Sequence, residues 1–434
     1  CTVTSSSVST RWAFSIAAGF IRISKMQTTL AEPYRNTPEG DAAERILRNC
    51  VHCGFCLATC PSYQILGNEL DSPRGRIYLL KQVLEGATPT AKTQLHLDRC
   101  LTCRNCETTC PSGVEYGKLL DIGRHIVEEK VGRGMVETAT RAALKSGLGT
   151  PMLFNSALKL GQSVRSLMPA FLKASIPAAE TAGEWPQPRH ARRMLVLQGC
   201  VQPGLKPNIN AATARVLDRI GISLIAEKEA GCCGALPHHL NDTDAGLAAA
   251  RRNIDAWLPH FDAGVEAIVM TASGCGVMVK DYGWLLRNDP AYADKATRVS
   301  AATKDISEVL IPEREALKRL AVRPVPKRIA YHPPCTLQHG QKLSGGVEAL
   351  LTQAGFELTP VAEKHLCCGS AGTYSILQPE IAGALKTRKL NHLQAGQPEM
   401  IITANIGCLT HLQSGSSIPV RHWVELLDSA LSPS

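Results

Sequence analysis

The second half of the chain alternates short apolar runs with amphipathic helical patterns. Four segments each contain a short apolar run, then glycine or proline, and end at a cysteine: residues 193–200, 267–275, 328–335 and 400–408. Runs of this length, bounded in this way, are typical of buried parallel strands. Between them, apolar residues recur with helical spacing over residues 208–221, 244–258, 346–355 and 380–393. The alternation predicts an α/β fold built from βαβ-type units.

Cysteines repeat along the same segments, which indicates a duplicated domain. In each copy, 31 residues separate a first cysteine from a Cys-Cys-Gly tripeptide, and 41 or 39 residues then lead to a cysteine beside glycine. We therefore predict two cysteine-rich units, called CCG units here, spanning residues 191–322 and 323–434. Their cysteines are Cys200, Cys232, Cys233 and Cys275 in the first unit, and Cys335, Cys367, Cys368 and Cys408 in the second.

We expect these cysteines to lie at or just beyond the carboxyl ends of strands, where α/β folds place their ligands. The matched spacing predicts that the two sets face a common cleft. Four converging thiolates suit an iron–sulfur cluster or a redox-active set. A zinc site and a group of inert buried thiols are the alternatives. The residues alone do not choose among them.

Two cysteine runs earlier in the chain share one spacing. "CVHCGFCLATCP" (50–61) and "CLTCRNCETTCP" (100–111) both read C-x2-C-x2-C-x3-C-P. In two-cluster ferredoxins with this spacing, the fourth cysteine of each run ligates the other run's cluster. A zinc site would instead use two C-x2-C pairs separated by a longer arm. We predict two [4Fe–4S] clusters, the first bound by Cys50, Cys53, Cys56 and Cys110, the second by Cys100, Cys103, Cys106 and Cys60.

Composition and charge narrow the class of protein. The chain has 434 residues and 17 cysteines, whereas secreted disulfide scaffolds are normally short. We therefore expect a reduced, intracellular protein whose cysteines are metal ligands. No apolar run reaches the eighteen or so residues of a membrane-spanning helix. The net charge of +9, with few aromatic residues and no nucleic-acid motif, predicts no nucleic-acid partner.

Two segments fall outside the predicted domains. Residues 1–25 begin with cysteine and contain no acidic residue. We expect the natural protein to start at Met26, which is followed by "QTTLAEPYRN". We expect 1–25 to be a non-native or upstream extension, which leaves 26–137 for the ferredoxin-type domain. Residues 138–190 form a basic, amphipathic linker that includes Lys159, Arg165 and Lys173. It either packs on its own domain or docks to a membrane surface or a partner.

With both repeats established, the sequence resembles the iron–sulfur subunit of bacterial glycolate oxidase (glycolate dehydrogenase) from about Met26 to the end. The resemblance rests on the two ferredoxin runs, the intervening "DSPRGRIYLL" and the two CCG units. It implies a helical two-cluster ferredoxin domain followed by a duplicated α/β CCG domain. It also implies flavin-binding partner subunits that carry the FAD, and a place in the cytoplasm, peripheral on the inner face of the cytoplasmic membrane.

Other families share parts of this pattern. The same order of domains occurs in the iron–sulfur subunit of anaerobic glycerol-3-phosphate dehydrogenase. Related CCG domains occur in lactate-utilisation proteins and heterodisulfide reductases. In heterodisulfide reductases each unit ends in C-x2-C and supplies a fifth cysteine, but here Met278 and His411 stand at that position. This departure argues against the unusual cluster of that family and leaves a simpler one open.

The expected role is electron transfer within a glycolate (2-hydroxy acid) oxidase, from a partner flavin to a membrane acceptor such as quinone. No G-x-G-x-x-G follows a strand, which agrees with flavin bound only by partners. An enzyme acting at its own CCG cysteines and a structural metal-binding scaffold are the alternatives. No catalytic residue is assigned. The nearest candidates are histidines close to the ligand loops, which more often pack or donate hydrogen bonds: His238, His239, His332 and His365.

Overall fold

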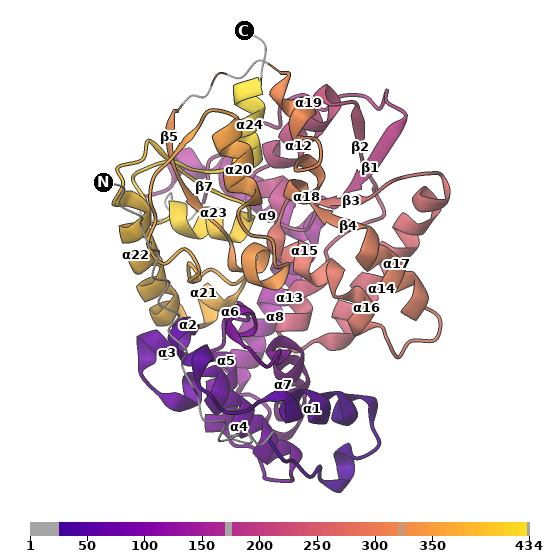
Figure 1. Cartoon of the computed structure of the whole chain (residues 1–434), viewed down its shortest axis with the longest axis vertical. Coiled ribbons are helices and arrows are strands. Elements are labelled where there is room, and N and C mark those ends of the chain that lie inside the picture. The colour runs from indigo at the N-terminus through magenta and orange to yellow at the C-terminus, as the bar shows by residue number, and fades with distance from the viewer. Residues whose placement is uncertain (1–25, 170–175, 321–322, 324–325, 432–434) are drawn as a thin grey trace, which may run out of the picture.

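The computed structural model describes residues 26–169, 176–320, 323 and 326–431. The chain forms a helical domain at the bottom of Figure 1 and two α/β units above it. The first unit, in magenta to orange, lies at the upper right, and the second, in orange to yellow, at the upper left. The predicted combination of a helical domain with a duplicated α/β domain is confirmed.

The helical domain contains both ferredoxin runs. Its helices are α1 (Pro38–Asn49), α2 (Phe55–Thr59), α3 (Pro61–Leu66), α4 (Pro73–Leu84), α5 (Ala91–Asp98), α6 (Asn105–Thr109) and α7 (Tyr116–Val131). The hydroxyl of Ser72 accepts the Gly75 backbone N–H and caps α4, and Pro73 occupies its first turn. Leu80 of α4 packs against Gly123 of α7, where any side chain would collide. The apolar core of these helices holds the cysteine loops in place.

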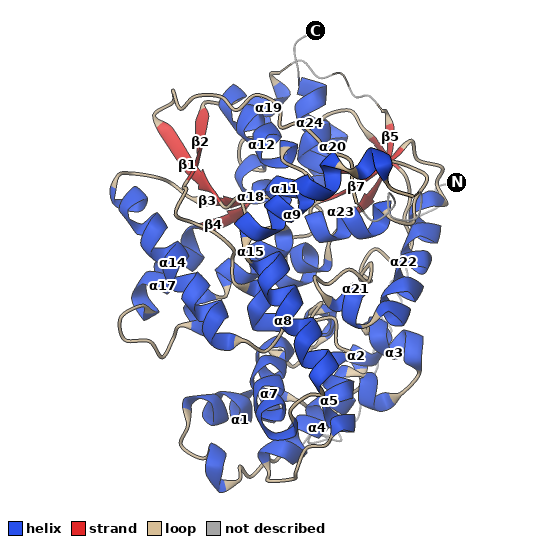
Figure 2. Cartoon of the chain, turned by 180° about the vertical axis from the view of Figure 1, so that it is seen from behind, coloured by secondary structure: helices blue, strands red, loops and turns tan. Residues whose placement is uncertain are grey.

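Two further helices lead into the first α/β unit. They are α8 (Met135–Gly149) and α9 (Pro151–Ser163), on the face seen in Figure 2. Arg141 of α8 is buried and pairs with Glu137 and Asp98. Phe154 and Leu158 of α9 lie against Gly204. Part of the basic stretch therefore packs on the protein itself, and Lys173 lies outside the described residues.

The first unit is a parallel sheet in the order β2-β1-β3-β4. Its strands are β1 (Arg192–Val196), β2 (Ile222–Ala226), β3 (Ile268–Met270) and β4 (Thr303–Asp305). Its helices are α11 (Gln202–Leu205), α12 (Asn208–Arg219), α13 (Ala235–His239), α14 (Thr243–Asp262), α15 (Ser273–Lys280), α16 (Tyr282–Leu285), α17 (Ala293–Ala302), α18 (Ile306–Leu310) and α19 (Arg314–Lys318). The strands and helices predicted from the apolar pattern in this unit are β1, β3, α12 and α14.

The second unit repeats the topology in the order β6-β5-β7-β8, again parallel. Its strands are β5 (Arg328–His332), β6 (Glu357–Leu358), β7 (Met400–Thr403) and β8 (Val420–His422). Its helices are a π-helix (Thr336–Gly340), α20 (Gly346–Gln353), α21 (Tyr374–Leu377), α22 (Pro379–Gln394), α23 (Ile406–Gln413) and α24 (Trp423–Leu431). The matching order of the two sheets is the structural counterpart of the repeated cysteines.

The two α/β units share one hydrophobic core. Helix α24 of the second unit packs on α12 of the first, and its Asp428 pairs with Arg215 and Arg219 at 2.7 Å each. At the carboxyl ends of the sheets, the Ser273 backbone N–H donates to the carbonyl of Ala404. The start of α15, which carries Cys275, therefore lies beside the end of β7 just before α23, which carries Cys408. The common cleft itself stays a prediction.

Candidate iron–sulfur sites

The eight ferredoxin cysteines form two groups that cross between the runs. Cys110 lines a pocket with the first three cysteines of the first run, Cys50, Cys53 and Cys56. Cys60 lines a second pocket with Cys100, Cys103 and Cys106. Cys106 also borders the first pocket. This is the crossed grouping expected from the spacing, with the fourth cysteine of each run beside the other run's first three.

The two runs wind their backbones alike. His52 and Gly54 in the first run, and Thr102 and Arg104 in the second, all have positive φ. These left-handed residues turn each loop around its pocket just before α2 or α6 begins. The Thr102 backbone N–H also points at Sγ of Cys100, 3.4 Å away. Non-glycine residues in this conformation carry strain that a ligand site can exploit.

Burial shapes the acidity of these thiols. Burial, followed by the nearby Cys50, raises the pKa of Cys56 to about 12. Burial and the neighbouring Cys335 raise the pKa of Cys103, and burial and Cys103 raise that of Cys106. A metal relieves this cost because it binds thiolates directly. The donor set therefore fits iron–sulfur clusters.

Each of the four cysteine sets has a basic side chain beside it. Arg74 lines the first ferredoxin pocket and Arg76, fully buried, lines the second. In the first CCG unit, Arg252 donates to the carbonyl of Cys232. In the second, Lys389 is 2% exposed; burial lowers its pKa, and Cys368 and Cys367 act against that shift. These cations offset the negative charge that clustered thiolates bring.

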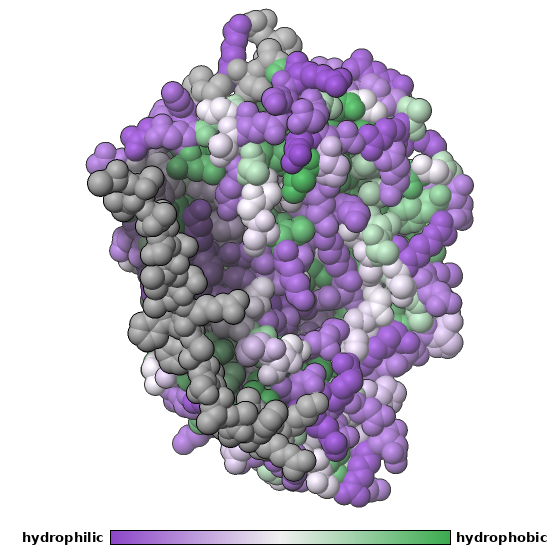
Figure 3. Space-filling model, in the orientation of Figure 1, coloured by the Kyte–Doolittle hydropathy of each residue, from purple (hydrophilic) through white to green (hydrophobic). Residues whose placement is uncertain are grey.

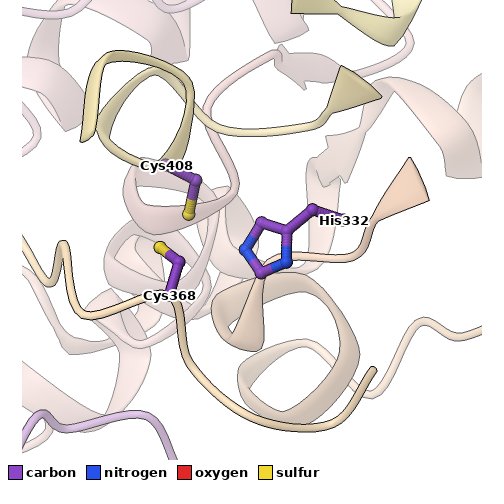
Figure 4. A group of neighbouring side chains, drawn as sticks. All are labelled: His332, Cys368 and Cys408. Atoms are coloured by element: carbon purple, nitrogen blue, oxygen red, sulfur yellow. The ribbon is translucent and has the colours of Figure 1, made fainter. Parts of the chain in front are cut away.

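The second CCG unit gathers its four cysteines with a histidine. The Sγ atoms of Cys335 and Cys367 are 3.7 Å apart. Cys368 and Cys408 lie with His332 so that all three ligand atoms are within 4.8 Å of one another (Figure 4). Two amide groups donate toward these sulfurs, the Gly369 backbone N–H to Cys367 at 3.4 Å and Asn405 Nδ2 to Cys408 at 3.6 Å.

The first CCG unit forms a corresponding row of thiols. Cys232 accepts hydrogen bonds from Cys200 and Cys233, which lowers the pKa of Cys232 to about 3. The same contacts raise the pKa of Cys200 and Cys233. The Gly234 backbone N–H also points at Sγ of Cys232, at 3.5 Å. This row holds one thiolate readily, which is the form that binds metals.

The glycine of each CCG tripeptide is required by its position. Gly234 has φ of +87°, and a Cβ there would lie 2.6 Å from the carbonyl oxygen of Gly246 in α14. Gly369 has φ of +92°, and its Cβ would lie 2.5 Å from the carbonyl oxygen of Ala382 in α22. Only glycine combines this backbone with so close an approach. The tripeptides follow β2 and β6 by several residues, farther from the strand ends than the other cysteines.

Cys103 joins the ferredoxin domain to the second CCG unit. It lies in one apolar cluster with Cys335, Cys367 and Tyr374. Around it, the Tyr374 hydroxyl donates to the carbonyl of Arg99 at 3.0 Å. Thr108 Oγ1 and His339 Nδ1 are 2.7 Å apart. The second ferredoxin set and the second CCG set are therefore neighbours across a packed, hydrogen-bonded joint.

The ferredoxin domain meets the first CCG unit through charged groups instead. His238 Nε2 lies 3.5 Å from Asp121 Oδ2 of α7, and Arg104 pairs with Asp281. Burial opposes both charges, yet the contact raises the pKa of His238 and lowers that of Asp121 to about 2. Burial and then His238 lower the pKa of His239 to about 4, so it stays neutral.

The four candidate histidines thus have different roles. His238 and His239 belong to the joint described above. The carbonyl of His365 accepts from Asn105 Nδ2 at 3.1 Å and from His339 Nε2, and its side chain is half-buried. Among the four, His332 alone faces cysteine sulfurs (Figure 4). Burial lowers the pKa of His332, which keeps its imidazole neutral, the form that ligates metals.

Sequence reasoning missed several residues that shape the sites. Arg76 belongs to "DSPRGRIYLL", whose position between the runs was the available signal. Within it, the carbonyl of Asp71 accepts from Ser62, which contacts the sulfur of Cys60. Lys389 gave no comparable signal, because it reaches the cysteines only through the tertiary fold. Asn405 stands three residues before Cys408, and this proximity in the sequence was the available signal.

All sixteen cysteines among the described residues are free thiols. Within the same part of the chain, no helix combines the length and the apolar character needed to cross a membrane. The cysteines are therefore available as metal ligands.

Comparison with known proteins agrees with this geometry. Models of the 4Fe-4S dicluster domain and of the cysteine-rich domain match residues 46–114, and 194–280 and 329–413, respectively. The chain is 57% identical to the glycolate oxidase iron–sulfur subunit of Escherichia coli (strain K12), covering 94% of this chain and 99% of that protein. It is 31% identical to the probable glycolate oxidase iron–sulfur subunit of Bacillus subtilis (strain 168), and the match covers 85% of this chain and 89% of that protein. It is 26% identical to lactate utilization protein A of Shouchella clausii (strain KSM-K16), and the match covers 53% of this chain and 96% of that protein.

Proposed function

The chain belongs to the family of glycolate oxidase iron–sulfur subunits, and we propose that it carries electrons from flavin-binding partner subunits to a membrane acceptor such as quinone. In this role the partners hold the FAD and oxidise glycolate. This subunit contributes no catalytic residue to that oxidation. Its task is to fix the ligands, burial and hydrogen bonding of its redox groups, which set their potentials.

We assign ligands to each site from the grouping of the thiols. Cys50, Cys53, Cys56 and Cys110 would hold one [4Fe–4S] cluster, and Cys60, Cys100, Cys103 and Cys106 a second. The CCG cysteines would hold further iron–sulfur groups. When bound, such clusters accept and release electrons one at a time.

The observation that carries this proposal is the position of Cys103. It is buried together with Cys335 and Cys367 in one apolar cluster. A predicted ligand of the ferredoxin domain is thus packed in the same buried cluster as two cysteines of the second CCG unit. This arrangement suits a protein whose redox groups follow one another through its interior.

The loop of the first cysteine set is open to a partner. Cys53 is exposed, and the neighbouring Phe55 is 61% exposed. Exposed aromatic residues next to a ligand loop are typical of protein contact surfaces. We propose that a flavin subunit contacts this surface.

For the exit of electrons we propose a peripheral position on the inner face of the cytoplasmic membrane. Hydrophilic residues cover most of the face in Figure 3, with hydrophobic ones in small groups. On the opposite face, α9 exposes Met152 and Leu160, at 80% and 68%. An amphipathic helix with exposed apolar residues and a basic residue, here Lys159, suits a membrane surface.

The test is electron throughput in the complex with its flavin subunits. Glycolate-dependent reduction of a soluble quinone is followed optically, and reduction of the ferredoxin clusters is followed by EPR. We expect Cys368→Ala and Cys233→Ala each to stop quinone reduction while glycolate still reduces the ferredoxin clusters.

Dithionite reduction of the same samples shows whether the ferredoxin clusters are present. Full throughput in Cys368→Ala would contradict a relay through the second unit. Full throughput in Cys233→Ala would limit the first unit to a scaffold. Turnover of glycolate by the isolated chain would overturn the division of labour between the subunits.

A further inference from the structure

His332 is a buried polar residue of the second CCG unit. It is the last residue of β5 and is 1% exposed. Neither of its ring nitrogens has a hydrogen-bond partner among the described residues. Leaving such a buried group without a hydrogen-bond partner destabilises the protein. His332 also lies at the carboxyl end of a sheet, where α/β folds bind their ligands. Both features indicate that its imidazole binds a ligand.

The imidazole is aimed at two thiols. Its ligand nitrogen and the Sγ atoms of Cys368 and Cys408 all lie within 4.8 Å of one another (Figure 4). These three donors come from β5, from the CCG tripeptide and from α23, so the fold itself brings them together. Two more cysteines extend the set to five buried donors. The thiol of Cys367 is hydrogen-bonded to that of Cys368, and Sγ of Cys335 lies 3.7 Å from Sγ of Cys367.

The first CCG unit has no such histidine. His332 precedes Cys335 by three residues, and the residue three before Cys200 is the buried Leu197. The other histidine near the second set, His411, points elsewhere, with Nε2 3.4 Å from the carbonyl of Ala382. The duplicated units therefore differ in one donor, which is nitrogen in the second and absent in the first.

We propose that His332 is a nitrogen ligand to iron in an iron–sulfur centre of the second CCG unit, together with Cys368 and Cys408. Imidazole and thiolate together suit zinc or iron–sulfur centres. A single zinc ion takes four ligands, whereas this site offers five donors in a continuous set. Replacing a thiolate by a neutral imidazole raises a cluster's reduction potential.

This inference rests on the proposed electron-transfer function, and its test is separate from throughput. The full chain is prepared anaerobically with ¹⁵N-labelled histidine, reduced in steps, and examined by pulsed EPR for strongly coupled nitrogen. We expect such a coupling in the native protein, with the isotope change expected for histidine. His332→Leu, which copies the first unit, should lose it, and the control His411→Leu should keep it.

His332→Cys provides a check that does not depend on losing the ligand. It should retain the iron of the native protein, lose the nitrogen coupling and titrate at a lower potential. Three results would overturn the proposal: no strongly coupled histidine nitrogen in the native protein, a coupling that persists in His332→Leu, or zinc in place of iron in the second unit. In the first two cases glycolate-driven quinone reduction can still proceed, so the proposed function survives the loss of this ligand assignment.

Discussion

The side-chain amide of Asn405 donates a hydrogen bond to Sγ of Cys408 across 3.6 Å. Its oxygen accepts the backbone N–H of Gly274, at 3.3 Å, next to Cys275. One side chain thus connects the two helices that carry the last cysteine of each CCG unit, α15 and α23. The connection makes the two units a structural pair and gives Asn405 a direct influence on one sulfur.

We expect Asn405→Ala to lower the reduction potential of the second CCG centre. A hydrogen bond to sulfur stabilises the reduced, more negative state. Its net value of about 1 kcal/mol corresponds to about 40 mV for one electron. A redox titration followed by EPR measures the shift. Asn241→Ala is the control, because Asn241 bonds Glu128 and no sulfur. An unchanged potential would show that Asn405 serves only to join the units.

Crossed ligation is tested by a pair of matched variants. We expect Cys60→Ser to damage the cluster of the second run, because Cys60 shares a pocket with Cys100 and Cys103. Cys110→Ser should damage the cluster of the first run. EPR spectra of the reduced variants, with iron and sulfide analysis, distinguish the two clusters. If each substitution harms the cluster of its own run instead, the ligands do not cross.

The CCG glycine should be essential for stability. Gly369→Ala places a Cβ 2.5 Å from the carbonyl oxygen of Ala382 and keeps a left-handed backbone. The backbone alone costs about 1–2 kcal/mol, and the collision adds to it. We expect the free energy of unfolding to fall by at least about 2 kcal/mol. Denaturant titration of the full chain measures this loss.

Gly383→Ala is the matched control for that experiment. Gly383 lies inside α22, and a Cβ there meets nothing within 4 Å. Alanine favours a helix interior by about 1 kcal/mol over glycine. The control should therefore match or exceed the native stability. Equal losses at both positions would contradict the steric account of the tripeptide.

Much of the fold followed from local patterns. The strands β1, β3, β5 and β7 were predicted because their apolar runs end at glycine or proline close to a cysteine. The outer strands were not predicted. β4 reads Thr-Lys-Asp and β6 has two residues, so neither carries an apolar run, and their positions come from pairing with a central strand, which a local pattern does not encode. β2 reads Ile-Ser-Leu-Ile-Ala, so its apolar run was overlooked.

The cysteine sites likewise include features that the local sequence predicted and features that it did not. The first three cysteines of each run group together because one short loop carries them, and the repeated spacing led us to expect the fourth from the other run. The contact of Cys103 with Cys335 and Cys367 was not predicted, since it joins segments more than 200 residues apart. Lys389 was missed for the same reason, because nothing in the pattern of α22 indicates that a distant sulfur will lie beside it. Asn405 is different, because it stands only three residues before Cys408 and its local hydrogen bond to that sulfur was overlooked.

The joint between α7 and the first CCG unit should weaken as the pH rises. Asp121 raises the pKa of His238 above its ordinary value of 6.5. The stabilisation is therefore complete below pH 6.5 and is lost as the pH rises through the folded-state pKa. Because the pKa of Asp121 is lowered to about 2, the stabilisation that its ionised carboxylate contributes is complete above pH 3.8. Between pH 6 and 8.5, the melting temperature should fall more in the native chain than in Asp121→Asn.

His239 supplies the control for this pH dependence. Its pKa is about 4, so it stays neutral throughout that range. His239→Asn should keep the native slope of melting temperature against pH. A slope that Asp121→Asn leaves unchanged would assign the pH dependence to another group.

Helix α9 presents different residues on its two sides. Phe154 and Leu158 pack near Gly204, whereas Met152 and Leu160 are largely exposed. We expect Met152→Ser with Leu160→Ser to weaken binding of the complex to vesicles containing anionic lipid. Lys159→Glu with Arg165→Glu should weaken it by roughly tenfold or more, at about 1 kcal/mol for each basic residue. Co-sedimentation at low and high salt measures both effects, since salt screens the second more than the first.

Ile376→Ser is the control for exposed apolar surface, because Ile376 is 54% exposed but lies in α21. It should leave vesicle binding unchanged. If the α9 variants also bind as the native complex does, while the complex stays assembled, the membrane does not contact this helix. The exposed side of α9 would then be a surface for another subunit, because apolar side chains exposed to this degree gain free energy only when something covers them. Loss of assembly in the same variants would identify that subunit contact directly.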